Sequence, residues 1–471
     1  MRGHNWLFAA NPRLTRRFTF LFPPAVGALV FLAASLWPAP DSAQPPASVS
    51  EFCSQAESLR QEQRLPELLS LCEQALASSP APELEAAAHR FLGEYYEELE
   101  FANDMRARGL APGDFRKAEA EYQKAIELAP QTEQAAWATV GLAECKRLHN
   151  VSNNDDYRSA LATYQRVVVT WPGTEAARWA QVRIARYYTS EKQWDRAEAE
   201  YKKALQDPKP THWMGRAAVM LAEHYRQMGQ ALKLPAFLSK AAAQFEKALQ
   251  DYGPRLGETH SADAQTKIAM CHRLLGDNAA AAQAYQKVLD NYPASKWCAE
   301  GHRGLAVMAS EEERYDDAIA HYQAIIDGGY RTSPAGGMDW APYARYYMAE
   351  CYGRKGDVTR ALQELRAVVD SAPDTKEARN ALHLTGCFLL QAGRCGEART
   401  AFREVISRWP GSPEAALAQL SIGQAYRAEG KQADGVQAYQ KVLDIYPDKA
   451  SYKPWREAAS EWLARLRAAE K

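Results

Sequence analysis

The sequence predicts an all-α protein, a solenoid of about ten helical hairpins that ends in a capping helix. Three observations support this fold class: a pattern that marks the second helix of each hairpin, a matching pattern for the first helix, and a composition rich in helix-forming residues. The 471 residues are 46% hydrophobic and 24% charged. A single compact core rarely extends over so long a chain, whereas a repeat array buries each unit only against its neighbours.

The second-helix pattern is an alanine, an aromatic residue four positions later, and a proline about eight positions after that. The segment AEAEYQKAIELAP shows it with Ala118, Tyr122 and Pro130. The small residue lets a partner helix approach, the ring one turn later fills the adjoining space, and the proline ends the helix. The first two positions of the copies, some of them degenerate, are Leu68/Cys72, Ala118/Tyr122, Ala160/Tyr164, Ala197/Tyr201, Ala241/Phe245, Ala281/Tyr285, Ala318/Tyr322, Ala361/Leu365, Ala398/Phe402 and Gly435/Tyr439.

A first helix precedes each second helix. In the well-formed units an apolar residue, a small residue and a third packing residue stand 13, 12 and 9 positions before the key alanine, as in Ile184, Ala185 and Tyr188. The turn that follows often contains glycine, for example Gly276 or Gly356. Each unit is therefore predicted to be a helical hairpin.

These residues resemble the tetratricopeptide repeat family over about residues 50–450. The resemblance implies a right-handed α-solenoid. Four intervals between key positions are 37 residues, longer than the 34 residues usual for the family, and the excess follows the proline. This longer form resembles the repeats of two bacterial envelope proteins, the lipoprotein of the β-barrel assembly machinery and the Tol–Pal cell-division coordinator. The chain differs from both in having more repeats and no lipobox.

The first segment has the order of an export signal. Residues 1–37 carry basic residues and then an uncharged apolar stretch, which is typical of a signal peptide or an N-terminal membrane anchor. Both interpretations stay open. Residues 38–49 form a Pro/Ser/Ala linker, 50–450 the repeats, and 451–471 a capping helix. We therefore expect an exported protein, periplasmic or membrane-anchored, with its repeats outside the cytoplasm.

We expect no catalytic activity, no cofactor and no bound metal. The sequence contains no H-E-x-x-H, no glycine-rich phosphate loop and no G-x-S-x-G. The eight cysteines are too few for a disulfide framework, although Cys53 with Cys72, and Cys387 with Cys395, are each either a disulfide or a pair of packed thiols. The net charge of −1 gives no reason to expect nucleic-acid binding, and a membrane would be met only through the N-terminal segment.

The resemblance implies that the first helices line a concave groove that binds other proteins or peptides. Exposed positions of that groove hold many Arg, Trp and Tyr residues, the types that anchor protein interfaces. The candidate residues are Arg90, Glu94, Trp137, Arg147, Trp179, Arg186, Arg216, Arg226, Arg273, Arg303, Tyr343, Tyr346 and Arg427. We expect a non-enzymatic interaction scaffold of the cell envelope or, alternatively, an accessory structural subunit of an envelope enzyme, secretion or outer-membrane assembly complex.

Two further features bear on the ligand. Some family members hold a carboxylate with Lys and Asn, but the equivalent positions here carry Glu223 and Glu350, which would repel it. The connector 328–341 lacks the closing proline and carries Tyr330 and Trp340, two aromatic residues that are costly to leave in water.

Overall fold

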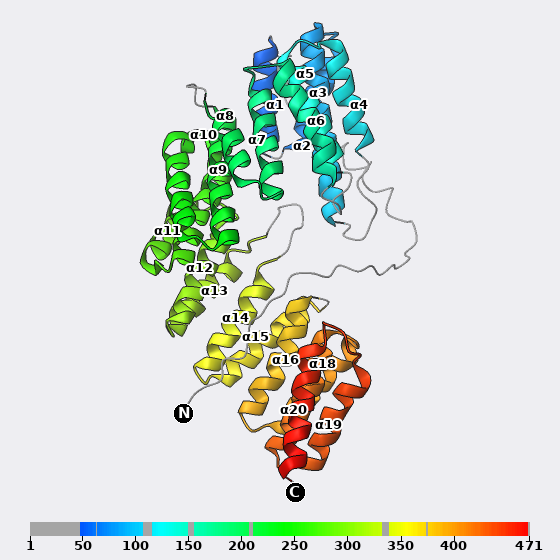
Figure 1. Ribbon diagram of the computed structural model, residues 1–471, viewed down its shortest axis with the longest axis vertical. Helices are drawn as coiled ribbons and strands as arrows, with labels where there is room; N and C mark the ends of the chain where they lie inside the picture. Colours follow the sequence, from blue (N-terminus) through cyan, green and yellow to red (C-terminus); the bar gives the residue numbers. More distant parts are fainter. Residues whose placement is uncertain are drawn as a thin grey trace, which may run out of the picture. The chain divides into compact units, whose positions relative to one another are not determined.

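The computed structural model describes residues 48–62, 64–106, 115–148, 155–206, 211–331, 339–373 and 375–469, and these form twenty α-helices (Figure 1). They belong to two compact units, residues 1–206 and 207–471, which we describe separately. The signal or anchor predicted at 1–37 lies outside the described residues. Among the described helices, none is both long enough and apolar enough to cross a membrane.

Unit 1 contains four hairpins, α1 with α2, α3 with α4, α5 with α6 and α7 with α8. The first helices α1, α3, α5 and α7 also contact one another in series. The helices are α1 Val49–Gln61, α2 Leu65–Ala77, α3 Pro82–Arg106, α4 Arg116–Leu128, α5 Glu133–Leu148, α6 Asp155–Thr170, α7 Glu175–Ser190 and α8 Trp194–Ala204.

Unit 2 contains six hairpins and a final helix, α20, that packs on α18 and α19. Its helices are α9 His212–Leu232, α10 Pro235–Leu275, α11 Asn278–Asn291, α12 Cys298–Glu311, α13 Tyr315–Asp327, α14 Ala341–Arg354, α15 Val358–Ser371, α16 Lys376–Gln391, α17 Cys395–Arg408, α18 Pro413–Ala428, α19 Gln432–Ile445 and α20 Lys453–Ala469. The predicted fold class, an α-solenoid of about ten hairpins with a final capping helix, is thus confirmed.

The long helix α10 serves two hairpins. Gly257 interrupts it with φ 75° and ψ 162°, a conformation that suits glycine. The part before Gly257 pairs with α9, and the part after it is the first helix of the hairpin with α11. The sequence pattern places this helix end at Pro254, whereas the structure keeps Pro254 inside the helix and breaks three residues later.

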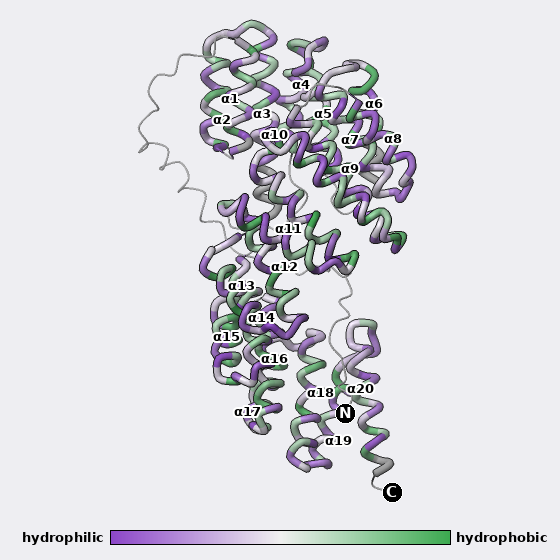
Figure 2. The backbone as a smooth tube through the Cα atoms, turned by 90° about the vertical axis from the view of Figure 1, so that its left-hand side faces the viewer, coloured by the Kyte–Doolittle hydropathy of each residue, from purple (hydrophilic) through white to green (hydrophobic). Residues whose placement is uncertain are grey.

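The recurring pattern forms the core. Ala118, Ala281 and Ala398 are completely buried, and Tyr122 and Tyr285 are each 1% exposed. The rings pack against small residues of the first helices. If Gly423 carried a Cβ, that atom would lie only 2.5 Å from the Tyr439 ring. Burying such a ring contributes about 2–3 kcal/mol. Each helix consequently has one apolar and one polar side, which Figure 2 shows as alternating green and purple along the tube.

The connector between α13 and α14 is fixed at both ends. Arg331 and Asp339 form an isolated β-bridge, and the Trp340 amide donates a hydrogen bond of 3.2 Å to the Tyr330 carbonyl. Tyr330 and Trp340 pack against the cluster around Tyr322 and Met348. The two aromatic residues are therefore partly covered by their own hairpins.

All eight cysteines are free thiols in the structure, and six of them are buried. Neither Cys53 with Cys72 nor Cys387 with Cys395 forms a disulfide. Of the two interpretations left open by the sequence, the structure has the packed thiols.

Candidate partner-binding site

All the candidate residues lie on first helices, and we call the surface that they share the first-helix face of each unit. Unit 1 carries Arg90, Glu94, Trp137, Arg147, Trp179 and Arg186. Unit 2 carries Arg216, Arg226, Arg273, Arg303, Tyr343, Tyr346 and Arg427. The candidates therefore occur in both units, and the first-helix face of each unit is described by itself.

The prediction that these positions are exposed is wrong for two of them. Arg90 is 6% exposed and Trp179 is 4% exposed. Neighbouring first helices contact each other, so part of the side that a single hairpin leaves free is covered by the next hairpin. Arg186 and Arg427 are exposed.

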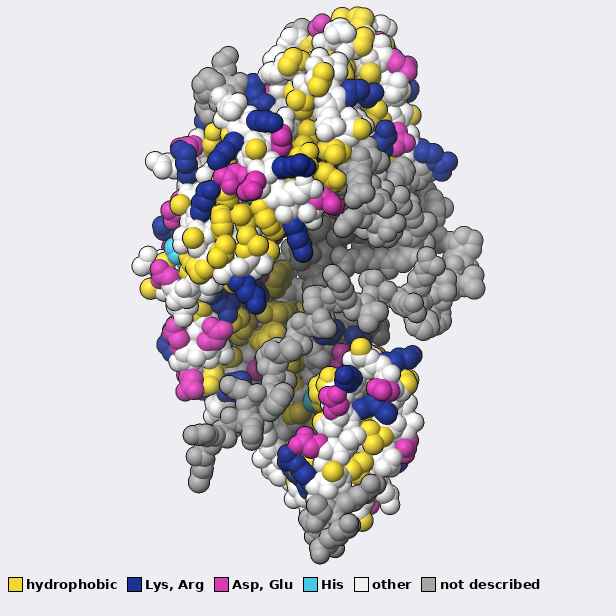
Figure 3. All heavy atoms as spheres, viewed as in Figure 1, with side chains coloured by type: hydrophobic (Ala, Val, Ile, Leu, Met, Phe, Trp, Pro, Cys, Tyr) yellow, Lys and Arg dark blue, Asp and Glu magenta, His cyan; other side chains and the backbone are white. Residues whose placement is uncertain are grey.

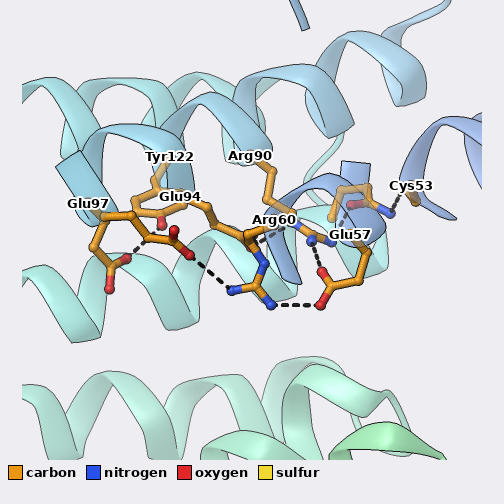
Figure 4. A network of polar contacts seen from close by, with 9 residues as sticks. Cys53, Glu57, Arg60, Arg90, Glu94, Glu97 and Tyr122 are labelled. Atoms are coloured by element: carbon orange, nitrogen blue, oxygen red, sulfur yellow. Dashed lines mark hydrogen bonds and ion pairs between the residues drawn. The ribbon is translucent and has the colours of Figure 1, made fainter. Parts of the chain in front are cut away.

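In unit 1, four charged side chains of α1 and α3 form a closed ring of alternating sign (Figure 4). Arg60 contacts Glu57 at 2.6 Å and Glu94 at 3.3 Å. Arg90 contacts Glu94 at 3.0 Å and Glu57 at 3.8 Å, which closes the ring. Arg90 also donates a hydrogen bond of 3.1 Å to Gln134 of α5. The ring and this hydrogen bond thus join three first helices, and the ring gives Arg90 and Glu94 partners inside the molecule.

A second polar centre lies between α5, α6 and α7. Glu144 contacts Arg183 at 2.6 Å and Arg147 at 2.9 Å, and it accepts a hydrogen bond of 2.5 Å from the Tyr164 hydroxyl. Burial opposes ionisation of Glu144, but the two guanidinium groups outweigh it and hold its pKa below the ordinary value. Arg183 also lies over the Trp179 ring, 4.9 Å from its centroid.

Glu97 of α3 is a half-buried carboxylate whose pKa departs strongly from the ordinary value. Its burial, followed by the charge of Glu144, raises its pKa to about 8. The hydrogen bond from Tyr122 at 2.8 Å acts in the opposite direction but is too weak to compensate. Unit 1 therefore holds its first helices together with a largely internal network of charges.

The arginine candidates of unit 2 also contact other side chains of the protein. Arg226 contacts Glu223 at 2.6 Å, Arg273 contacts Glu311 at 2.7 Å, and Arg303 donates to Glu300 at 2.8 Å. Two others lie over tryptophan rings, Arg216 at 5.0 Å from Trp213 and Arg427 at 3.7 Å from Trp462. On the face that Figure 3 shows, the described basic and acidic side chains are interspersed with hydrophobic ones.

The helix α14 carries a connected series of aromatic rings. Tyr343 and Tyr347 are 4.5 Å apart between centroids, and Tyr346 is 5.1 Å from Tyr347. Trp340 extends the series at one end, 5.6 Å from Tyr343, and Tyr322 stacks on Tyr347 at 6.0 Å. All of these rings are half-buried except Tyr322, which is buried, so most of them keep exposed area.

Sequence reasoning found Tyr343 and Tyr346 but missed Tyr347, which contacts both. The spacing of Tyr343 and Tyr347 by four residues, one helical turn, was a signal that could have identified it. Arg60 and Arg183 were missed too, because each also pairs with a glutamate of another hairpin, Glu94 and Glu144 respectively.

Glu350 lies one turn after Tyr346 and Tyr347 on α14. Burial raises the pKa of its carboxyl, and the nearby positive charge of Arg354 does not overcome that effect. Within the described residues, this carboxylate has neither an ion pair nor a hydrogen bond. No group of three or more metal-binding side chains is found in the part of the chain that the structure describes.

The fold and this site define the protein as an α-solenoid with aromatic and charged first-helix faces. The tetratricopeptide repeat family matches the sequence over residues 113–132, 263–295, 343–375 and 385–450. The chain thus carries tetratricopeptide-type repeats. No curated protein matches the sequence, and the narrower resemblance to two bacterial envelope proteins stays a prediction.

Several solved structures are similar to this one. A tetratricopeptide repeat protein from Parabacteroides merdae is 13% identical over 62% of this chain and 98% of that chain, with a TM-score of 0.38. YrrB, described as a TPR protein with an unusual peptide-binding site, is 19% identical over 46% of this chain and 99% of that chain, with a TM-score of 0.32. A human IFIT1 dimer with PPP-AAAA is 15% identical over 84% and 82%, with a TM-score of 0.40. Similarities of this size carry no conclusion about what the present chain binds.

Proposed function

We propose that this protein is a non-enzymatic interaction scaffold that binds partner proteins or peptides on its first-helix faces. The observation that supports this most strongly is the aromatic series of Tyr343, Tyr346 and Tyr347 on α14. Half-buried tyrosines offer rigid apolar area together with a polar tip, and such residues supply much of the binding energy at protein interfaces.

Tyr343, Tyr346, Tyr347 and Glu350 form what we call the α14 face. This face is a better candidate for the binding surface than the charged network of unit 1. In unit 1, Arg90 and Glu94 already pair with Arg60 and Glu57, so a partner would have to compete with those contacts. On α14, the tyrosines retain exposed area, and Glu350 forms no ion pair among the described residues, with Arg354 as its nearby positive charge. A bound segment gains more where such groups are free to contact it.

Export to the cell envelope is part of the proposal. It rests on the order of basic, apolar and Pro/Ser-rich segments in residues 1–49, which is typical of an export signal or anchor. Mass spectrometry of the mature N-terminus, on protein isolated from the native cell, distinguishes a cleaved signal from a retained anchor. An intact N-terminus on protein recovered from the cytoplasm would contradict export.

A pull-down from native cells tests the binding function. The bait is the full chain, compared with a Tyr343→Ala/Tyr347→Ala variant and a matched control, Gln363→Ala/Arg366→Ala, whose side chains are exposed on the second helix α15. Melting curves of all three establish that they are folded. We expect the wild type and the control to retain the same proteins and the tyrosine variant to lose them.

Two outcomes would count against the proposal. Identical partner sets for the wild type and the tyrosine variant would show that the α14 face is not the binding surface. A constant, stoichiometric complex with one enzyme would favour the alternative of an accessory subunit.

A further inference from the structure

The partner chemistry of the α14 face follows from the carboxylate of Glu350, which lies beside its tyrosines, and this inference rests on the proposed function. Glu350 is half-buried beside Tyr346 and Tyr347, whose phenols feel its charge. Burial, followed by Tyr343 and Glu350, raises the pKa of Tyr347 to about 12, which keeps the phenol neutral at physiological pH. The rings therefore carry no negative charge of their own, and the Tyr343 hydroxyl already interacts with Arg303 and Tyr347.

The surrounding cations do not satisfy Glu350. Arg303 donates to Glu300 at 2.8 Å, and Arg345 contacts Glu364 of α15 at 2.7 Å. Arg354, on the same helix as Glu350, lowers its pKa less than burial raises it. A partly desolvated carboxylate without a close counter-ion is costly, and a cation placed beside it repays that cost.

We infer that the α14 face recognises a basic side chain, lysine or arginine, of the bound partner segment. Glu350 is the counter-ion, and the rings of Tyr343, Tyr346 and Tyr347 are the apolar wall along which the aliphatic stem and the charged head of that side chain lie. A cation over an aromatic ring adds to the attraction, and a guanidinium group stacks on such rings especially well. An acidic segment would be repelled from the same position.

The test selects peptides without assuming a partner. A phage library of random peptides is selected on the full-length chain, and the enriched peptides are labelled and titrated by fluorescence anisotropy. The chain variants are Glu350→Gln, which preserves the size of the side chain, Tyr343→Ala/Tyr347→Ala, and the control Glu246→Gln on α10, whose carboxylate is exposed.

We expect the enriched peptides to share a lysine or arginine. Glu350→Gln should weaken their binding about tenfold or more and reduce its salt dependence, because one ion pair is lost. Replacing the basic residue of the peptide by norleucine should weaken binding to the wild type equally, with no further loss in Glu350→Gln. Glu246→Gln should bind as the wild type does.

The possible outcomes distinguish a failure of this inference from a failure of the proposed binding function. Peptides whose binding depends on the tyrosines but not on Glu350 would contradict the recognition of a basic side chain, while the binding function of this face would still be supported. If no peptide is enriched, or if the enriched peptides are indifferent to the tyrosine variant, the binding function of this face fails and the inference fails with it.

Discussion

The hydroxyl of Tyr122 on α4 donates a hydrogen bond of 2.8 Å to the Glu97 carboxylate on α3. Tyr122 is the aromatic residue of its repeat and is 1% exposed, so the repeat pattern brings a buried phenol to the half-buried carboxylate of Glu97 in the first-helix layer. The pKa of that carboxylate is raised from 4.5 to about 8, mainly by burial and by Glu144.

The stability of unit 1 should therefore depend on pH through Glu97. A raised carboxyl pKa means that the folded state binds the proton more tightly than the unfolded state does. The contribution of Glu97 to the free energy of unfolding is therefore complete below pH 4.5 and is lost as the pH rises through 8. Glu97→Gln should raise the free energy of unfolding at pH 8 to 9 by about 1–3 kcal/mol, because a neutral amide replaces the half-buried charge. Denaturant unfolding at pH 5 and pH 9 measures it. A variant less stable than the wild type at pH 9 would show that the carboxylate is a favourable partner there.

Gly386 and Phe402 test the packing of first on second helices. A Cβ on Gly386 would lie 2.4 Å from the ring of Phe402, which is completely buried. Gly386→Ala should lower the stability by about 1–3 kcal/mol, as overpacked cores do. The control lies in the same hairpin: at Gly396 the nearest atom is the end of the Arg399 side chain, at 3.9 Å. Gly396→Ala should be neutral or gain up to about 1 kcal/mol. Equal effects in thermal or urea unfolding would contradict this packing.

Arg183 should matter more than surface arginines. It contacts Glu144 at 2.6 Å, and their side chains are 12% and 8% exposed. Arg183→Met leaves Glu144 with Arg147 and Tyr164 only, and we expect a loss of about 2 kcal/mol in urea unfolding. Arg64, exposed beside Glu62 and Glu67, is the control, and Arg64→Met should change little. A loss as large for Arg64→Met would remove the distinction between the buried and the exposed pair.

The thiols should be slow to react and all free. Burial raises the pKa of Cys387 to about 12 and that of Cys53 above its ordinary value, and the other six cysteines are buried. Iodoacetamide at pH 8 should label Cys53 and Cys387 slowly in the folded protein and all eight after unfolding without reductant. Mass spectrometry identifies which cysteines are labelled in each sample. Cys53 and Cys72 missing together from the unfolded sample would indicate a disulfide.

The repeats could be predicted from the sequence because the same packing contact recurs. Ala118 and Tyr122 meet a partner helix in the same way as Ala281 and Tyr285, so the copies confirm one another. The break in α10 was not predicted, because the repeat pattern contains no residue that marks the left-handed conformation at Gly257.

The candidate site was predictable only in part. The spacing along one helix identifies residues on the same side, which gave Tyr343 and Tyr346. It does not show which residues the next hairpin covers, and Trp179 and Arg90 are covered. The pairing of Arg60 with Glu94 joins separate hairpins, so it becomes visible only when the hairpins are stacked.

Photo-crosslinking in the native cell tests directly whether a partner protein binds at Tyr347 on the first helix α14. A benzoylphenylalanine replaces Tyr347 on the first helix α14 or, as a control, Arg366 on the second helix α15, and the products are identified by mass spectrometry. We expect a crosslinked partner protein at position 347 and none at position 366. Crosslinks at position 366 alone, or the same products from both positions, would contradict binding on the first-helix face.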